Sequence, residues 1–180
     1  PDDSILRPGG IWDQALAAYV RGARPALPGV SFELDYHQGT FHPRATLHLW
    51  IPADLTDPAA RKRACLDALR AGRYYATSAP PDALVLEECV LTAGDAAAAP
   101  GERLPAAGPL TLSYSIRSEN PLQWVQILRD GAVVQTLTTP AGAWRDARAS
   151  AQAAPAYYRL MAQDVSGHGL VCMPIFVQSP

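Results

Sequence analysis

Asp35 and His37 are the residues of this chain whose types and spacing most directly suggest chemistry. They flank Tyr36, and residues two apart on a β-strand point to the same face of the sheet. A carboxylate oxygen and a neutral imidazole nitrogen are common ligands of Zn²⁺, Mn²⁺ and Fe²⁺. The pair therefore predicts part of a divalent metal site, although Asp and His at strand ends are more often solvated or hydrogen-bonded.

The other histidines add little to this pair. His42 follows closely enough to fold back as a further donor, whereas His48 alternates with apolar neighbours and is typical of an edge strand. His168 lies between two glycines, which predicts an exposed turn. No Gly-x-Ser-x-Gly elbow and no phosphate-binding glycine loop is present in the sequence. No residue is therefore assigned as a catalytic acid, base or nucleophile.

Helix and strand signals are mixed in the first eighty residues. Asp57 followed by Pro58 predicts a helix start, because Asp can accept backbone N–H bonds and Pro fits the first helical turn. Gly72 predicts its end. The predicted elements are a helix over 11–21, a strand over 30–34 that ends at Asp35 and His37, a strand over 45–51, and a helix over 58–71.

Beyond residue 80 the sequence consists of strand and turn signals. Leu110, Leu112, Tyr114 and Ile116 alternate with polar residues, as in a sheet with one buried face, and Asp130-Gly131 predicts a tight hairpin. Residues 92–109 and 141–155 are rich in small or polar residues and predict loops. The predicted strands cover 83–91, 110–117, 123–129, 132–137, 157–163 and 170–177, a pattern typical of an immunoglobulin-like or fibronectin-like antiparallel β-sandwich.

Composition limits the classes of partner. The chain has 180 residues, a formal net charge of −2 and a pI of about 6.1, so it lacks the basic surface on which phosphate neutralisation of nucleic acids depends. No apolar run reaches membrane-spanning length. Cys65, Cys89 and Cys172 have no Cys-x-x-Cys spacing and are interpreted as buried free thiols. They leave a cytoplasmic and a periplasmic location equally open.

The order of motifs resembles one known protein family. Trp12-Asp13 on a helix, Asp35-Tyr36-His37, Arg44-Ala45-Thr46-Leu47, and 68–78 with its Arg-Ala-Gly-Arg helix end are similar to the C-terminal part of polymerase-and-histidinol-phosphatase (PHP) metallohydrolases. The resemblance is to the branch with an appended β-sandwich, and it extends through the strands after residue 81.

This resemblance implies a fold and an activity. The expected fold class is α+β: residues 1–80 form the C-terminal segment of a partial β/α metallohydrolase barrel, and residues 81–180 form an immunoglobulin-like sandwich. In the family a late Asp-x-His pair helps close a multinuclear metal site, which implies that Asp35 and His37 are metal ligands. Arg44 resembles an arginine that could hold a small phosphorylated or anionic substrate. The implied reaction is hydrolysis of a phosphoester by metal-bound hydroxide.

The early His-x-His pair of the family and its further ligands do not occur in this sequence. The divalent metal site is thus incomplete, and we expect the chain to be the C-terminal portion of a longer enzyme, inactive alone and partnered by the missing N-terminal part of the barrel. The sequence begins with Pro1 instead of Met, which favours this interpretation.

The alternative is a non-catalytic β-sandwich for binding or structure, with a vestigial metal site. An aromatic patch could then meet a carbohydrate or a protein. Its candidate residues are Trp124, Trp144, Tyr157 and Tyr158, of which Trp144, in the predicted 141–155 loop, is the plausible exposed anchor.

Overall fold

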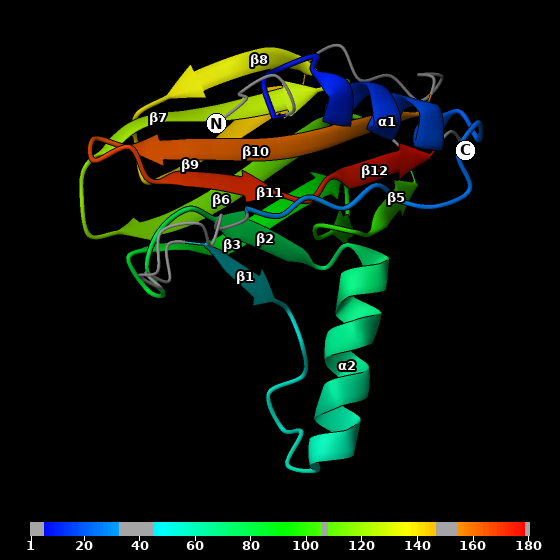
Figure 1. Ribbon diagram of the computed structural model, residues 1–180. Helices are drawn as coiled ribbons and strands as arrows, with labels where there is room; N and C mark the ends of the chain where they lie inside the picture. The colour runs from blue at the N-terminus through cyan, green and yellow to red at the C-terminus, as the bar shows by residue number, and fades with distance from the viewer. Residues whose placement is uncertain (1–5, 33–44, 106–107, 147–154, 179–180) are drawn as a thin grey trace.

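Two β-sheets pack face to face, with one helix on the outer face of the larger sheet and a second helix projecting away from both (Figure 1). The computed structural model describes residues 6–32, 45–105, 108–146 and 155–178. Its helices are α1 (Ile11–Val20) and α2 (Pro58–Ala71). No helix within these ranges is long and apolar enough to cross a membrane.

The larger sheet, sheet A, has eight strands. β10 lies at its centre and pairs with β7 on one side, while β11 and β12 follow one another along its other side. β8 continues the sheet beyond β7, β2 and β1 continue it beyond β11, and β5 continues it beyond β12. The strands are β1 (Thr46–Leu49), β2 (Tyr74–Thr77), β5 (Arg103–Pro105), β7 (Leu122–Arg129), β8 (Ala132–Leu137), β10 (Ala156–Asp164), β11 (Gly169–Cys172) and β12 (Ile175–Gln178).

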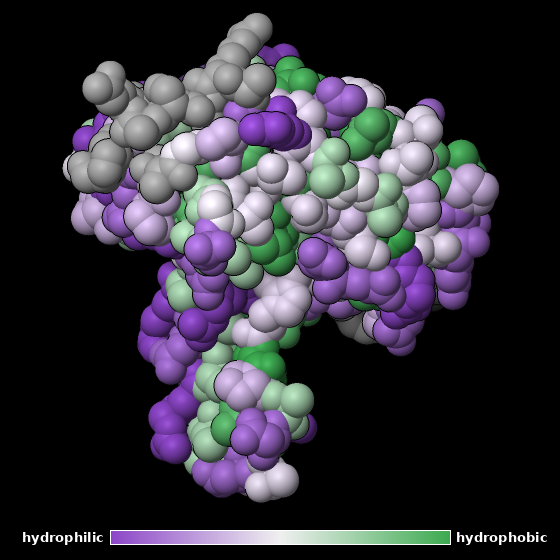
Figure 2. All heavy atoms as spheres, turned by 180° about the vertical axis from the view of Figure 1, so that it is seen from behind, coloured by the Kyte–Doolittle hydropathy of each residue, from purple (hydrophilic) through white to green (hydrophobic). Residues whose placement is uncertain are grey.

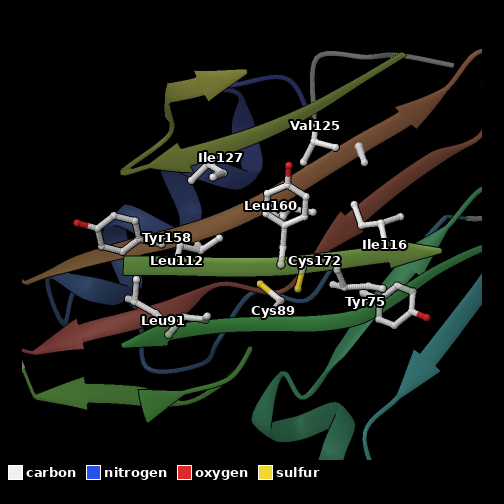
Figure 3. Close-up of a cluster of buried hydrophobic side chains, with 14 of the residues drawn as sticks. Tyr75, Cys89, Leu91, Leu112, Ile116, Val125, Ile127, Tyr158, Leu160 and Cys172 are labelled. Atoms are coloured by element: carbon white, nitrogen blue, oxygen red, sulfur yellow. The ribbon is translucent and has the colours of Figure 1, made fainter. Parts of the chain in front are cut away.

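The smaller sheet, sheet B, has four strands in the order β4-β3-β6-β9. They are β3 (Leu84–Ala93), β4 (Ala96–Ala98), β6 (Leu110–Ser118) and β9 (Ala141–Asp146). Every second residue of β6 from Leu110 to Ile116 is buried, as the sequence alternation predicts. These side chains meet Val125, Ile127 and Leu160 from sheet A in one apolar core between the sheets (Figure 3).

The central strands of sheet A are buried on both faces. Helix α1 covers the outer face of the sheet and forms a second apolar cluster, in which Trp12 and Leu16 pack with side chains from β2, β10 and β12. The Trp12 indole N–H donates a hydrogen bond to the Pro28 carbonyl at 3.1 Å. β2 is buried along its whole length for this reason. Its Tyr-Tyr-Ala-Thr sequence suits a strand enclosed by a helix on one side and a sheet on the other.

Several local predictions are confirmed. Asp57 caps α2 by accepting N–H bonds from Ala59 and Ala60, and Gly72 ends the helix in the left-handed conformation at φ 74°. Asp130 and Gly131 both have positive φ, the geometry of the hairpin turn that joins β7 to β8. The predicted strand over 170–177 is broken into β11 and β12 at Met173-Pro174, because Pro cannot donate to the ladder.

The predicted partial β/α barrel is wrong. A barrel segment needs parallel strands joined through crossover helices, but β1 and β2, which flank α2, pair antiparallel. Both belong to sheet A, because β2 also pairs antiparallel with β11. The described chain is therefore a mostly antiparallel β-sandwich with additional elements, and β12 with β5 is its one parallel pair. The division near Pro80-Pro81 stays a prediction; there the chain passes from sheet A to sheet B.

Two segments predicted as loops contain strands, and one segment predicted as a strand forms none in its described residues. Residues 92–109 include β4 and β5, and residues 141–155 include β9. Leu104 of β5 is fully buried, so this small-residue segment contributes to the core. Residues 30–32 are not in a strand, and Val30 donates its N–H to the Tyr74 hydroxyl at 2.9 Å. Sequence signals did not indicate β4, β5 and β9 because these strands are short and lie at sheet edges.

Candidate functional site

The predicted site residues lie outside the described part of the chain. Asp35, His37 and Arg44 fall within 33–44, as does His42. Their roles as metal ligands and as a substrate contact stay predictions. The metal also stays a prediction. The described residues contain no group of three or more His, Cys, Asp or Glu side chains that could hold an ion.

His168 is built into a turn and is not free in solvent, contrary to the sequence prediction. Its Nδ1 lies 2.9 Å from the Asp164 carboxylate, which also accepts backbone N–H bonds from Ser166 and His168 and a bond from the Asn120 amide. Burial acts to raise the pKa of Asp164, but these hydrogen bonds outweigh it and hold the pKa below its usual value. The group therefore stabilises the turn between β10 and β11.

His48 lies on the edge strand β1, as predicted, and contacts two residues of β2. Its ring stacks on Tyr75 with centroids 4.4 Å apart and planes 3° from parallel, and its Nε2 lies 3.3 Å from the Thr77 hydroxyl. Burial lowers the pKa of His48, and the nearby Asp82 charge only partly opposes this. Burial likewise raises the pKa of Tyr75 to about 12. Both rings are neutral near pH 7, which fits packing better than proton transfer.

We expect His48 to make the protein less stable in mild acid. The unfolded chain takes up a proton near pH 6.5, whereas the folded chain, with its lowered pKa, resists it. The contribution of His48 is complete above about pH 6.5 and is lost as the pH falls toward the folded-state pKa. Melting temperatures measured from pH 4.5 to 7.5 should fall less steeply for His48→Gln than for wild type. Equal slopes would contradict this assignment.

The predicted aromatic anchor packs partly against the core. Trp144 is in β9, is only partly exposed, and its ring lies 6.2 Å from that of Tyr158 in the core. Tyr157 and Tyr158 are buried, and the Trp124 indole donates to Gln163 at 3.1 Å. The described aromatic residues do not form the surface patch that a carbohydrate-binding face requires.

A buried ionic cluster joins α1 to β10, and sequence reasoning missed it. Arg159 donates from Nε and Nη2 to the two carboxylate oxygens of Asp13 at 2.8 and 2.6 Å, and its guanidinium lies over the Trp12 ring at 4.9 Å. The Tyr157 hydroxyl donates to Asp13 at 2.9 Å, and burial together with Asp13 raises the pKa of Tyr157 well above its usual value. Both side chains of the ion pair are buried, and the pair holds the helix on the sheet.

The most exposed feature of the fold is the arm, which we define as residues 50–73 with α2 (Figure 1). Ala68 is the one buried residue of α2. Leu66 is 41% exposed and Leu69 38% exposed, and they lie on one helix face with Lys62 because the three residues are spaced four and three apart. Seen from behind, apolar and polar side chains alternate over the surface of the arm (Figure 2).

The base of the arm is fixed to the sandwich. The Trp50 N–H donates to the Arg73 carbonyl at 3.1 Å, and Gly101 in the β4–β5 turn packs directly against the end of α2. Gly101 also donates its N–H to the Pro174 carbonyl at 2.8 Å. A side-chain Cβ at Gly101 would lie 2.3 Å from the Ala71 carbonyl oxygen. The arm is therefore rigidly rooted and free at its tip.

An open hollow of about 470 Å³ lies beside this base. It is lined by Tyr19, Pro25, Ala26, Leu27, Arg70, Ala71 and Gly101. No carboxylate, imidazole or thiol is among these residues, so the hollow offers no general acid, base or nucleophile beyond the Tyr19 phenol. The arm, and not this hollow, is the candidate functional site of the described chain.

Comparison with known proteins gives a likeness in architecture. Fibronectin(III)-like modules of Clostridium thermocellum CbhA match 54% of this chain and 97% of theirs, at 16% identity and a TM-score of 0.37. The likeness concerns the fold alone. An engineered protein matches 50% of this chain and 20% of its own, at 18% identity and a TM-score of 0.32. No family model and no curated protein matches the sequence.

Proposed function

We propose that this chain is a non-catalytic β-sandwich module that binds a separate protein domain through the arm. The observation that carries the proposal is the exposure of α2: a helix with one buried residue and two large exposed leucines projects from an otherwise well-packed sandwich. A helix of this kind gains little stability from its own fold, since tertiary packing of an apolar face normally supplies it. Docking of Leu66 and Leu69 would provide that packing.

The charges on the arm define the chemistry of the partner surface. Arg61, Lys62 and Arg63 form no ion pair with any described residue, whereas Arg70 pairs with Asp67 at 3.3 Å. A surface that combines an apolar patch with surrounding carboxylates would complement this face. A second copy of the chain fits less well, because two basic helices would repel each other.

The sequence resemblance identifies a first partner to test. It implies a metal-dependent phosphoesterase domain, whose substrate would be a small phosphorylated molecule. Asp35 and His37 would then add two ligands to a site completed by that domain, and Arg44 would meet the substrate. In the proposal that domain completes the metal site, and this chain alone performs no hydrolysis.

The gene provides the first test. A coding segment upstream of Pro1 with a His-x-His pair and further metal-type residues would support the phosphoesterase domain as the partner, and a start codon directly before Pro1 would contradict this choice of partner. The upstream domain can then be expressed separately and titrated with this chain by calorimetry. We expect binding that weakens with salt, because the arm is basic.

Variants of the arm test the contact itself. Leu66→Glu with Leu69→Glu should weaken binding tenfold or more, because each leucine loses its apolar contact and each new carboxylate must be desolvated or face like charges. The matched control is Val133→Glu on β8, a residue that is also 38% exposed but lies on the far edge of sheet A. Equal weakening by both changes, or dimerisation of the isolated chain through α2, would overturn the proposal.

A further inference from the structure

Two cysteines face each other across the core of the sandwich. Cys89 is on β3 of sheet B, opposite Tyr114 of β6, and Cys172 is on β11 of sheet A, opposite Tyr75 of β2. Their side chains point toward one another between the sheets (Figure 3), and the neighbouring Cys89 adds to burial in raising the pKa of Cys172. Cys89 is 4% exposed and Cys172 is fully buried. The third cysteine, Cys65, is half-buried on α2, in the arm.

We propose that Cys89 and Cys172 are a modification site, at which a disulfide forms between the two sheets when the chain folds in the presence of a disulfide oxidant. Because the two side chains already point toward each other across the core (Figure 3), closing the bond to about 2.05 Å requires side-chain rotation and an approach of the sheets. The proposal is independent of the function of the arm, since neither cysteine belongs to it.

The reaction is thiol–disulfide exchange with a small oxidised thiol such as glutathione disulfide. The thiolate of one cysteine attacks one sulfur of the oxidant, forms a mixed disulfide and releases one glutathione thiol. The second cysteine then gives up its proton and attacks the protein-bound sulfur. The Cys89–Cys172 bond forms and the second glutathione leaves as its thiol, so two electrons pass from the protein to the oxidant.

Access to the thiols sets the timing of this step. Burial, together with the neighbouring Cys89 side chain, raises the pKa of Cys172, so its thiol is protonated and shielded in the folded state. Exchange must therefore occur before the sheets close, or during a transient opening. Native protein should accordingly react with a thiol reagent only at Cys65.

Oxidative refolding tests the proposal. The chain is unfolded and reduced, refolded with reduced and oxidised glutathione, alkylated and digested with trypsin. We expect a cross-link between the peptides spanning 74–103 and 160–180, with Cys65 alkylated. Because this bond closes a long loop, the oxidised protein should melt about 10 °C above its reduced form.

Two variants show which cysteines form the cross-link. Cys65→Ser should show the same cross-link and the same shift in melting temperature, while Cys89→Ala with Cys172→Ala should show neither. Should the double variant fail to fold, peptide mapping of Cys65→Ser still decides the matter. Recovery of both core cysteines as alkylated thiols or as separate glutathione adducts would overturn the proposal, as would a cross-link to Cys65 in wild type or a bond that does not raise the melting temperature.

Discussion

Replacing Arg159 with Met will lower the free energy of unfolding by about 3–5 kcal/mol, as expected when one partner of a buried ion pair is removed. The guanidinium is fully buried and its partner Asp13 is 3% exposed. Without Arg159 the Asp13 carboxylate keeps two donors among the described residues, the Tyr157 hydroxyl and the Gly9 N–H, and both are neutral. Urea unfolding followed by tryptophan fluorescence measures the change, since Trp12 lies against the guanidinium.

Arg117→Met is the matched control, because it also removes an arginine from an ion pair. Arg117 and Glu87 are about half exposed, so solvent screens their interaction and the expected loss is about 1 kcal/mol or less. The double change of Asp13→Leu with Arg159→Met should regain part of the stability, since the uncompensated charge is removed. Similar losses for both arginine variants would show that burial does not increase the contribution of the Asp13–Arg159 pair to stability.

Gly101→Ala should be the second most damaging change, with a loss of about 3 kcal/mol or more. Gly101 has φ 84°, which L-residues rarely adopt, and its new Cβ would lie 2.6 Å from the Gly72 carbonyl carbon as well as close to Ala71. Both neighbours are backbone and cannot rotate away. The substitution should therefore separate the end of α2 from the β4–β5 turn, and thermal unfolding together with limited proteolysis of the arm would detect it.

Gly94→Ala distinguishes the two causes. Gly94 also has a positive φ, 59°, but a Cβ there would meet no atom within 4 Å. The Gly94→Ala substitution should lower the free energy of unfolding by only about 1–2 kcal/mol, from backbone strain, and leave the arm as resistant to protease as in wild type. If both glycine variants behave alike, the contact between Gly101 and α2 does not anchor the arm.

The helix ends and the main strands could be predicted because their causes are local. Asp57 and Gly72 define α2 through hydrogen bonds and backbone conformation within a few residues, and the alternation over β6 reflects its one buried face. The hairpin at Asp130-Gly131 has the same local origin. Such features need no knowledge of the rest of the fold.

The pairing of the first strands and the ionic cluster could not be predicted in this way. Whether β1 and β2 belong to a barrel or to a sandwich depends on β11, which lies almost a hundred residues further along the chain. Asp13 and Arg159 are 146 residues apart, and neither has a distinctive neighbourhood in the sequence. The metal pair Asp35 and His37 stays a prediction for a different reason, since it lies outside the described residues.

The break at Met173-Pro174 has a consequence for aggregation. It divides one side of sheet A into two stretches, which end in β1, a strand of four residues, and β5, a strand of three. A long unpaired edge would offer backbone N–H and C=O groups to the strands of other molecules, and short, offset edges offer few. The proline thus protects this side of the sheet from intermolecular β-pairing, and the other side, ending in the longer β8, is where such pairing would begin.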